Sequence, residues 1–137
     1  MDFAQLLRYA HDGFRWIVLI AAVVALLINL FALFTSRPSD DKLVKNGMRF
    51  WTISMDIQWL LGLLVILFGW IIPFGFGGTP RMFWEHAIGN TLAVAVAHSY
   101  MAFRKRGGRT PLIGNLATIV IALVILIATI ALVGGWS

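Results

Sequence analysis

The chain has no cysteine and little charge. Of its 137 residues only 12% are charged and four are proline, whereas 60% are hydrophobic. The absence of cysteine excludes disulfides, iron–sulfur clusters, thiolate metal sites and covalently attached c-type haem. The shortage of charge excludes an ordinary soluble domain, because there is too little polar surface to cover one. The composition therefore predicts an integral membrane protein.

Four long apolar runs occur along the chain, at about 14–35, 50–73, 83–103 and 112–134. Each is close to the ~20 residues that a helix needs to cross the hydrocarbon of a bilayer. The connections between them are short, so consecutive helices should be antiparallel neighbours. We predict an all-α fold in which 1–137 forms one multi-pass, up-down bundle of four transmembrane helices.

The basic residues are concentrated in the first and third predicted loops. They are Arg37, Lys42, Lys45 and Arg49 in the first loop, and Arg104, Lys105, Arg106 and Arg109 in the third. Cytoplasmic loops carry such an excess of Lys and Arg, so both termini are predicted on the outer, periplasmic side of a bacterial cytoplasmic (inner) membrane. Topology and anionic lipid explain the net charge of +5 better than nucleic acid does, and no nucleic-acid partner is expected.

Polar residues at the start of the first and third spans include two histidines. His11 and His86 open helices that both run from outside to inside, so their side chains should lie at similar depth. Two histidines that face each other across a bundle suit the iron of a six-coordinate b-type haem. Arg15 or Arg81 can meet the haem propionates, and Glu85 can pair with Arg15 or accept the second ring proton of a ligating histidine.

Two other interpretations of these residues stay open. Interfacial His, Trp and Arg are common in membrane helices, where they anchor the helix at the headgroups. A metal site built from His11, Asp12, Glu85 and His86 would offer nitrogen and oxygen ligands to zinc, iron or manganese. Adjacent helical residues point about 100° apart, so we rank the metal site below haem.

A second polar layer is predicted near the inner face. Its members are Asn29, Asp56, Gln58 and His98. His98 lies about 18 Å along the helix from His86, so the two cannot serve one haem. We expect Asp56 and His98 to pair, since the pair neutralises two costly groups at membrane depth. This cluster is either structural or a site for a quinone headgroup or for proton uptake.

Short motifs within the spans resemble a known family. The sequence reads HDGFRW at 11–16, DIQWLLG at 56–62, EH at 85–86 and AH at 97–98. These motifs resemble those of short four-span bacterial membrane proteins described as cytochrome b-like. The resemblance implies a b-type haem protein with histidine axial ligands, or a small accessory subunit of a respiratory or photosynthetic complex. Larger four-helix cytochromes carry two histidines on each of two helices, whereas this chain has three in all, which allows one bis-histidine haem.

The residues and the resemblance together lead to two functional hypotheses. The first is a haem b protein of electron transfer, ligated by His11 and His86, that exchanges electrons with quinone or with other membrane redox subunits in the bilayer. It would be an electron-transfer component rather than a stand-alone enzyme. The second is a cofactor-free accessory subunit whose polar residues only satisfy one another.

Overall fold

All regular secondary structure in the part of the chain that the structure describes, residues 1–134, is helical. In this computed structural model the long helices are α1 (Phe3–Phe34), α2 (Lys42–Ile66), α4 (Arg81–His98) and α5 (Thr110–Leu132). The π-helical turn η1 (Leu67–Ile71) extends α2 into the short α3 (Ile72–Phe74). Two 3₁₀ segments, η2 (Phe76–Gly78) and η3 (Ser99–Ala102), precede and follow α4.

Within residues 1–134, three helical segments are long and apolar enough to cross a membrane: Phe3–Phe34, Lys42–Phe74 and Thr110–Leu132. Their outward side chains fit a lipid environment, since Ile20, Leu27 and Val124 are each more than half exposed. α4 is not apolar enough to be counted with these three segments, although a fourth span was predicted at 83–103. Its charged and polar residues, described below, lower its apolarity.

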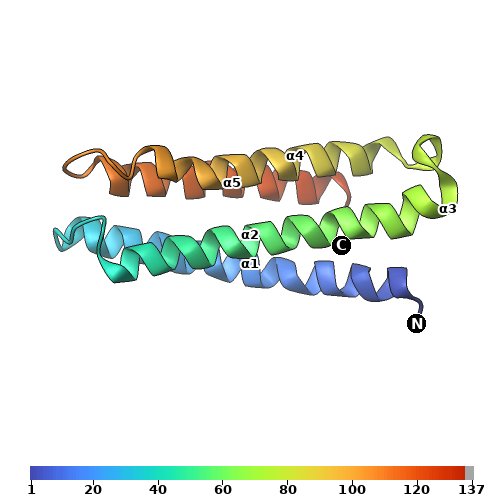
Figure 1. The fold of residues 1–137 in the computed structure, drawn as a ribbon, viewed down its shortest axis with the longest axis horizontal. Helices are drawn as coiled ribbons and strands as arrows, with labels where there is room; N and C mark the ends of the chain where they lie inside the picture. The colour runs from blue at the N-terminus through green and yellow to red at the C-terminus, as the bar shows by residue number, and fades with distance from the viewer. Residues whose placement is uncertain (135–137) are drawn as a thin grey trace.

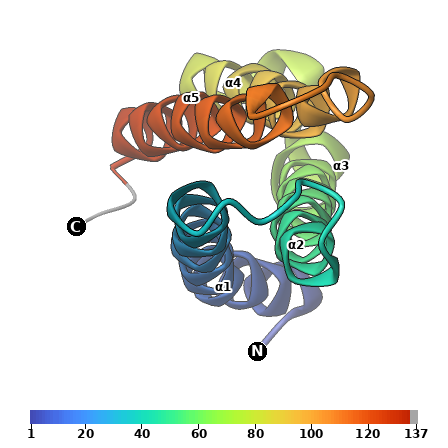
Figure 2. The same ribbon diagram turned by 90° about the vertical axis from the view of Figure 1, so that its left-hand side faces the viewer.

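The four long helices run side by side along the long axis of the molecule (Figure 1). α1 contacts α2 and α5, and α4 contacts α5 and α2, so that α1 and α4 lie diagonally across the bundle (Figure 2). The α1–α2 and α4–α5 connections lie at one end, and the α2–α4 connection lies at the other end with the N-terminus (Figure 1). The two predicted basic loops are therefore neighbours.

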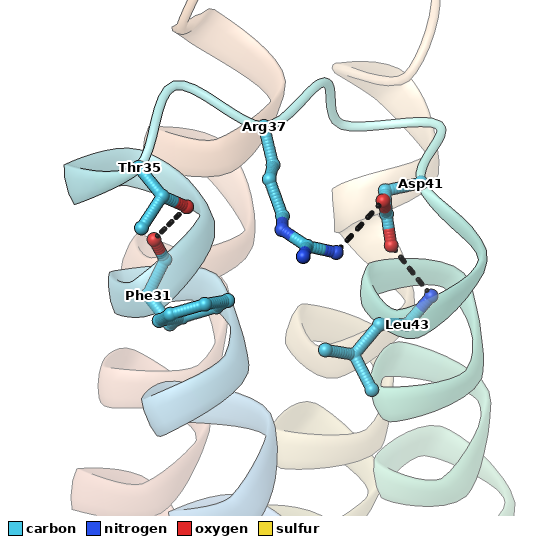
Figure 3. Close-up of polar contacts among 5 residues, drawn as sticks. All are labelled: Phe31, Thr35, Arg37, Asp41 and Leu43. Atoms are coloured by element: carbon cyan, nitrogen blue, oxygen red, sulfur yellow. Dashed lines mark hydrogen bonds and ion pairs between the residues drawn. The ribbon is translucent and has the colours of Figure 1, made fainter.

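Helix ends differ from the predicted span ends because capping, rather than apolarity, sets them. α1 begins at Phe3 and not near 14, since Asp2 and Gln5 form a capping box. α2 begins at Lys42 and not near 50, since Asp41 Oδ1 accepts a hydrogen bond 2.9 Å long from Leu43 N. Asp41 also pairs with Arg37 at 3.4 Å, as Figure 3 shows. Both helices are consequently longer than their apolar runs.

Small side chains bring the helices together in the core. Ala21, Ala25, Ala93 and Ala97 have no exposed surface and pack around the fully buried Trp51. Small residues at such contacts let helix backbones approach closely. The resulting van der Waals contacts stabilise helix association in a bilayer, where helices have no hydrophobic driving force to associate. Close packing of α1 and α4 around Trp51 of α2 therefore forms the main core of the bundle.

Candidate functional site

A cavity of about 370 Å³ lies nearer the end of the bundle that holds the N-terminus. We call it the histidine cavity, because it is lined by His11 from α1 and His86 from α4. All four long helices contribute to it; the other polar or charged lining residues are Arg8, Asp12, Arg15, Gln58 and Asn90. Apolar and aromatic side chains such as Trp70 and Phe83 complete the walls. Concave, mainly apolar sites with a few convergent polar groups are typical of small-molecule sites.

The two histidine rings lie next to each other within this cavity in a T-shaped arrangement, which agrees with their predicted similar depth. Their ring centres are 6.2 Å apart and their ring planes are nearly perpendicular, at 82°. Gly62 of α2 makes room for one of them, since a Cβ at that position would lie 3.1 Å from Cε1 of His11. A larger residue at 62 would push His11 out of its position.

The hydrogen bonds of His86 fix the position of its ring proton. Nδ1 lies 2.7 Å from the backbone oxygen of Thr129, so Nδ1 carries the proton and donates it. Thr129 is among the last four residues of α5, whose carbonyls have no partner within the helix. Nε2 then has a free lone pair, and it accepts a hydrogen bond 2.8 Å long from Asn90 Nδ2. His86 is therefore held with its proton on Nδ1 and with its Nε2 lone pair occupied by Asn90.

His11 is held by Gln58 of α2. Nε2 of Gln58 lies 3.2 Å from Nδ1 of His11 and donates to the backbone oxygen of His11 at 3.0 Å. The amide oxygen of Gln58 is buried and has no hydrogen-bond partner within residues 1–134. An unpaired buried acceptor is costly, which is a reason to expect a further donor at this position.

Two of the other predicted outer residues lie away from the histidines. Arg81 forms an ion pair with Glu85 at 2.6 Å, one turn apart on α4, and the Arg81 side chain is 90% exposed. Neither residue lines the histidine cavity. Arg15 does line it, together with Arg8.

The alternative of a metal bound by four protein ligands finds no support in the geometry. Within residues 1–134 no three His, Cys, Asp or Glu side chains are placed to share an ion. Glu85 is occupied by Arg81, which leaves the facing pair His11 and His86. A haem iron needs only two protein ligands, because the porphyrin supplies the other four.

The predicted inner cluster separates into three places. Asp56 and His98 pair as expected, with Nε2 of His98 2.8 Å from Oδ1 of Asp56. Asn29 instead bonds to Asn115 of α5, at 2.8 Å. Gln58 belongs to the histidine cavity, and its assignment to the inner layer was wrong. The reason is the early start of α2: Gln58 lies in the middle of a segment that runs from Lys42 to Phe74, not near its beginning.

The Asp56–His98 pair crosses between α2 and α4, and its removal should weaken their contact. The side chains are 48% and 35% exposed, so we expect Asp56→Ala to lower stability by only about 1 kcal/mol, the usual size of a polar contact between membrane helices. Thermal unfolding in detergent measures this. Glu85→Gln, which removes a carboxylate paired within one helix, is the control and should leave the melting temperature unchanged. An equal shift in both variants would show that Asp56 does not join the helices.

Thr129 is the site residue that sequence reasoning missed. Its hydroxyl donates to Asn90 Oδ1 at 2.9 Å, and its carbonyl holds His86. A single threonine in an apolar helix carries no distinctive pattern. The one usable signal was its place near the end of the helix, where carbonyls lack partners.

Comparisons with other proteins identified no match: no protein-family model, no curated protein and no solved structure matches the chain.

Proposed function

We propose that this chain is a membrane-bound b-type haem protein of electron transfer, with one haem held between His11 and His86. The observation that carries the proposal is the pair of facing imidazoles in a cavity formed by four helices. A haem is a one-electron carrier whose protein ligands and surroundings set its potential. The chain's own residues then have to bind it, orient it and exclude water.

The separation of the two rings fits this role. A metal–imidazole bond is about 2 Å long and a ring centre lies about 1 Å beyond the nitrogen, so two rings on opposite sides of one iron have centres about 6 Å apart. The ring centres of His11 and His86 are 6.2 Å apart. The aromatic and aliphatic lining of the cavity matches the apolar faces of a porphyrin.

The hydrogen bonds around the rings support the same assignment. Thr129 holds the proton of His86 on Nδ1, which leaves Nε2 as the ligand atom. Asn90 must release Nε2 when iron binds, and its amide oxygen remains bonded to Thr129. At His11 the amide nitrogen of Gln58 donates to Nδ1 and to the backbone oxygen, so Gln58 must turn away from Nδ1 before that atom can carry the proton that leaves Nε2 free for iron.

The propionates are assigned to the two cavity arginines. Arg8 and Arg15 line the histidine cavity, and the guanidinium of Arg8 also lies 5.9 Å from the ring centre of Trp70. Charge-assisted bonds from arginine to carboxylates are short and directional, so these residues would fix the orientation of the macrocycle. Arg81 is excluded from this role by its pairing with Glu85.

The proposed topology is an up-down bundle of four spans in a bacterial cytoplasmic membrane, with both termini outside. α4 counts as the fourth span because His86 and Asn90, which reduce its apolarity, face the histidine cavity, while His98 bonds to Asp56 of α2. The neighbouring basic loops at one end of the bundle support a cytoplasmic location for that end (Figure 2).

A quinone is the proposed electron partner inside the bilayer. Asp56 and His98 are polar, face each other at 2.8 Å and remain partly exposed on the surface between α2 and α4. Ionisable residues within spans are costly and mark functional positions. Quinone carbonyls require a hydrogen-bond donor of this kind, and other membrane redox subunits are the alternative partners.

A second candidate function, a cofactor-free accessory subunit, is favoured by one observation. His86, Asn90 and Thr129 satisfy one another through an unbroken chain of hydrogen bonds in which every contact is 2.9 Å or shorter. Such a chain needs no cofactor to be stable. The unpaired buried oxygen of Gln58 is the feature that this alternative leaves unexplained.

Absorbance spectroscopy of the purified protein separates the two candidates. Protein expressed with ample haem should show a sharp α-band on reduction by dithionite, and a pyridine haemochrome assay should give one haem per chain. A featureless spectrum in both redox states would refute the haem proposal and favour the accessory subunit.

A further inference from the structure

A second cavity, of about 440 Å³, lies at the end of the bundle that carries the two basic loops. Four cationic side chains line it: Lys45, Arg49, Arg104 and Lys105. We call it the basic cavity. Lys45 and Arg49 come from the first turns of α2, and the other two follow η3, so the cations converge from two separate loops.

The cations of the basic cavity are not neutralised by the protein. Asp40 is the one carboxylate in the lining, and within residues 1–134 it forms no ion pair with any of the four. By contrast, Arg37 at the same end is paired with Asp41 (Figure 3), and Arg106 lies over the ring of Phe103, 5.5 Å from its centre. The basic cavity therefore carries an excess of positive charge at a concave site.

Apolar side chains also line this cavity, beside the polar Ser39 and Asn115. Met101 is 50% exposed and Tyr100 is partly exposed, whereas Val44, Met48 and Pro111 are buried. A ligand that matches the site is anionic at one end and apolar at the other. A small inorganic anion would satisfy the cations but leave Met101 and Tyr100 without a partner.

We propose that the basic cavity is a binding site for an anionic phospholipid, whose phosphate is held by Lys45, Arg49, Arg104 and Lys105 while its glycerol and upper acyl carbons lie against Met101 and Tyr100. Basic pockets between membrane helices bind anionic headgroups in this way. The positive-inside rule accounts for cations in these loops, but it does not require that half of the eight basic residues of the two loops line one cavity. The site is remote from the histidines and does not depend on haem.

Native mass spectrometry of the full chain in detergent tests the site, with phosphatidylglycerol as the probe and phosphatidylcholine as the zwitterionic comparison. The variant Lys45→Gln/Arg104→Gln removes two cavity cations. The matched control Lys42→Gln/Arg109→Gln removes one Lys and one Arg from the same loops but outside the lining. At about 1 kcal/mol for each cation, the cavity variant should bind phosphatidylglycerol about 30-fold more weakly, and the control should bind as the wild type does.

Three results would overturn the proposal. Equal weakening in the cavity variant and the control would show a general charge effect without a site. Equal binding of the two lipids would show that the cavity does not select an anionic headgroup over a zwitterionic one. Displacement of phosphatidylglycerol by inorganic phosphate at equal concentration would show an anion site rather than a lipid site. If the double variant does not purify as a single species, Lys45→Gln and Arg104→Gln alone should each weaken binding about 5-fold.

Discussion

Replacing His86 by Ala should reduce the haem content of the purified protein at least about 10-fold, because the iron loses one of its two protein ligands. The pyridine haemochrome assay, expressed per chain, measures this. His98→Ala is the matched control: His98 ends the same helix but bonds to Asp56 and does not line the histidine cavity. Its haem content should equal that of the wild type.

His11→Ala provides an independent check on the same assignment. His86 also bonds to Thr129 and Asn90, so its loss can disturb the contact of α4 with α5. His11 contacts α2 instead, through Gln58. Both variants should lose haem, and wild-type haem content in either one would contradict bis-histidine ligation by this pair.

Replacing Gly89 by Ala should destabilise the protein by about 1–3 kcal/mol, the usual cost of overpacking a close contact. A Cβ at this position would overlap the side-chain methyl of Thr129 on α5. Thr129 cannot rotate away freely, because its hydroxyl is bonded to Asn90 Oδ1 and to the carbonyl of Leu126, each at 2.9 Å. The substitution must therefore separate α4 from α5 or break these bonds, and thermal unfolding in detergent should show the loss.

Gly13→Ala is the control for this substitution. Gly13 is a helical, exposed glycine of α1, and a Cβ there would have no atom within 4 Å. Alanine should stabilise the helix by about 0.5–1 kcal/mol, because glycine loses more backbone entropy on folding. The two changes are chemically identical but have opposite expected signs. Stabilisation by both substitutions would refute the close contact of α4 with Thr129.

The equal depth of His11 and His86 was predictable from the sequence because helical rise is constant and the short loops fix the direction of each helix. The same reasoning misplaced Gln58, since α2 starts in a charged segment that Asp41 caps, and apolarity does not mark such a start. Depth within a bundle depends on where helices begin. The predicted start of α2 was about two helical turns too late, and this error placed Gln58 in the inner polar layer instead of the outer one.

Other parts of the site have no sequence signal at all. The acceptor for His86 is a backbone carbonyl, that of Thr129, and every residue has one. The sequence suggested Arg15 as an ion-pair partner for Glu85, whereas the structure pairs Glu85 with Arg81, one turn earlier on the same helix. No motif in the sequence marks the π-helical turn at Leu67–Ile71, which extends α2 into α3.

Electron paramagnetic resonance of the oxidised, frozen protein tests the central claim, that His11 and His86 bind one haem iron from opposite sides. Their ring planes are 82° apart, and axial imidazoles with nearly perpendicular planes give low-spin ferric haem a strongly anisotropic, large-gmax signal. We predict this signal at one spin per chain. A high-spin haem signal, or no haem signal from protein expressed with ample haem, would contradict the claim.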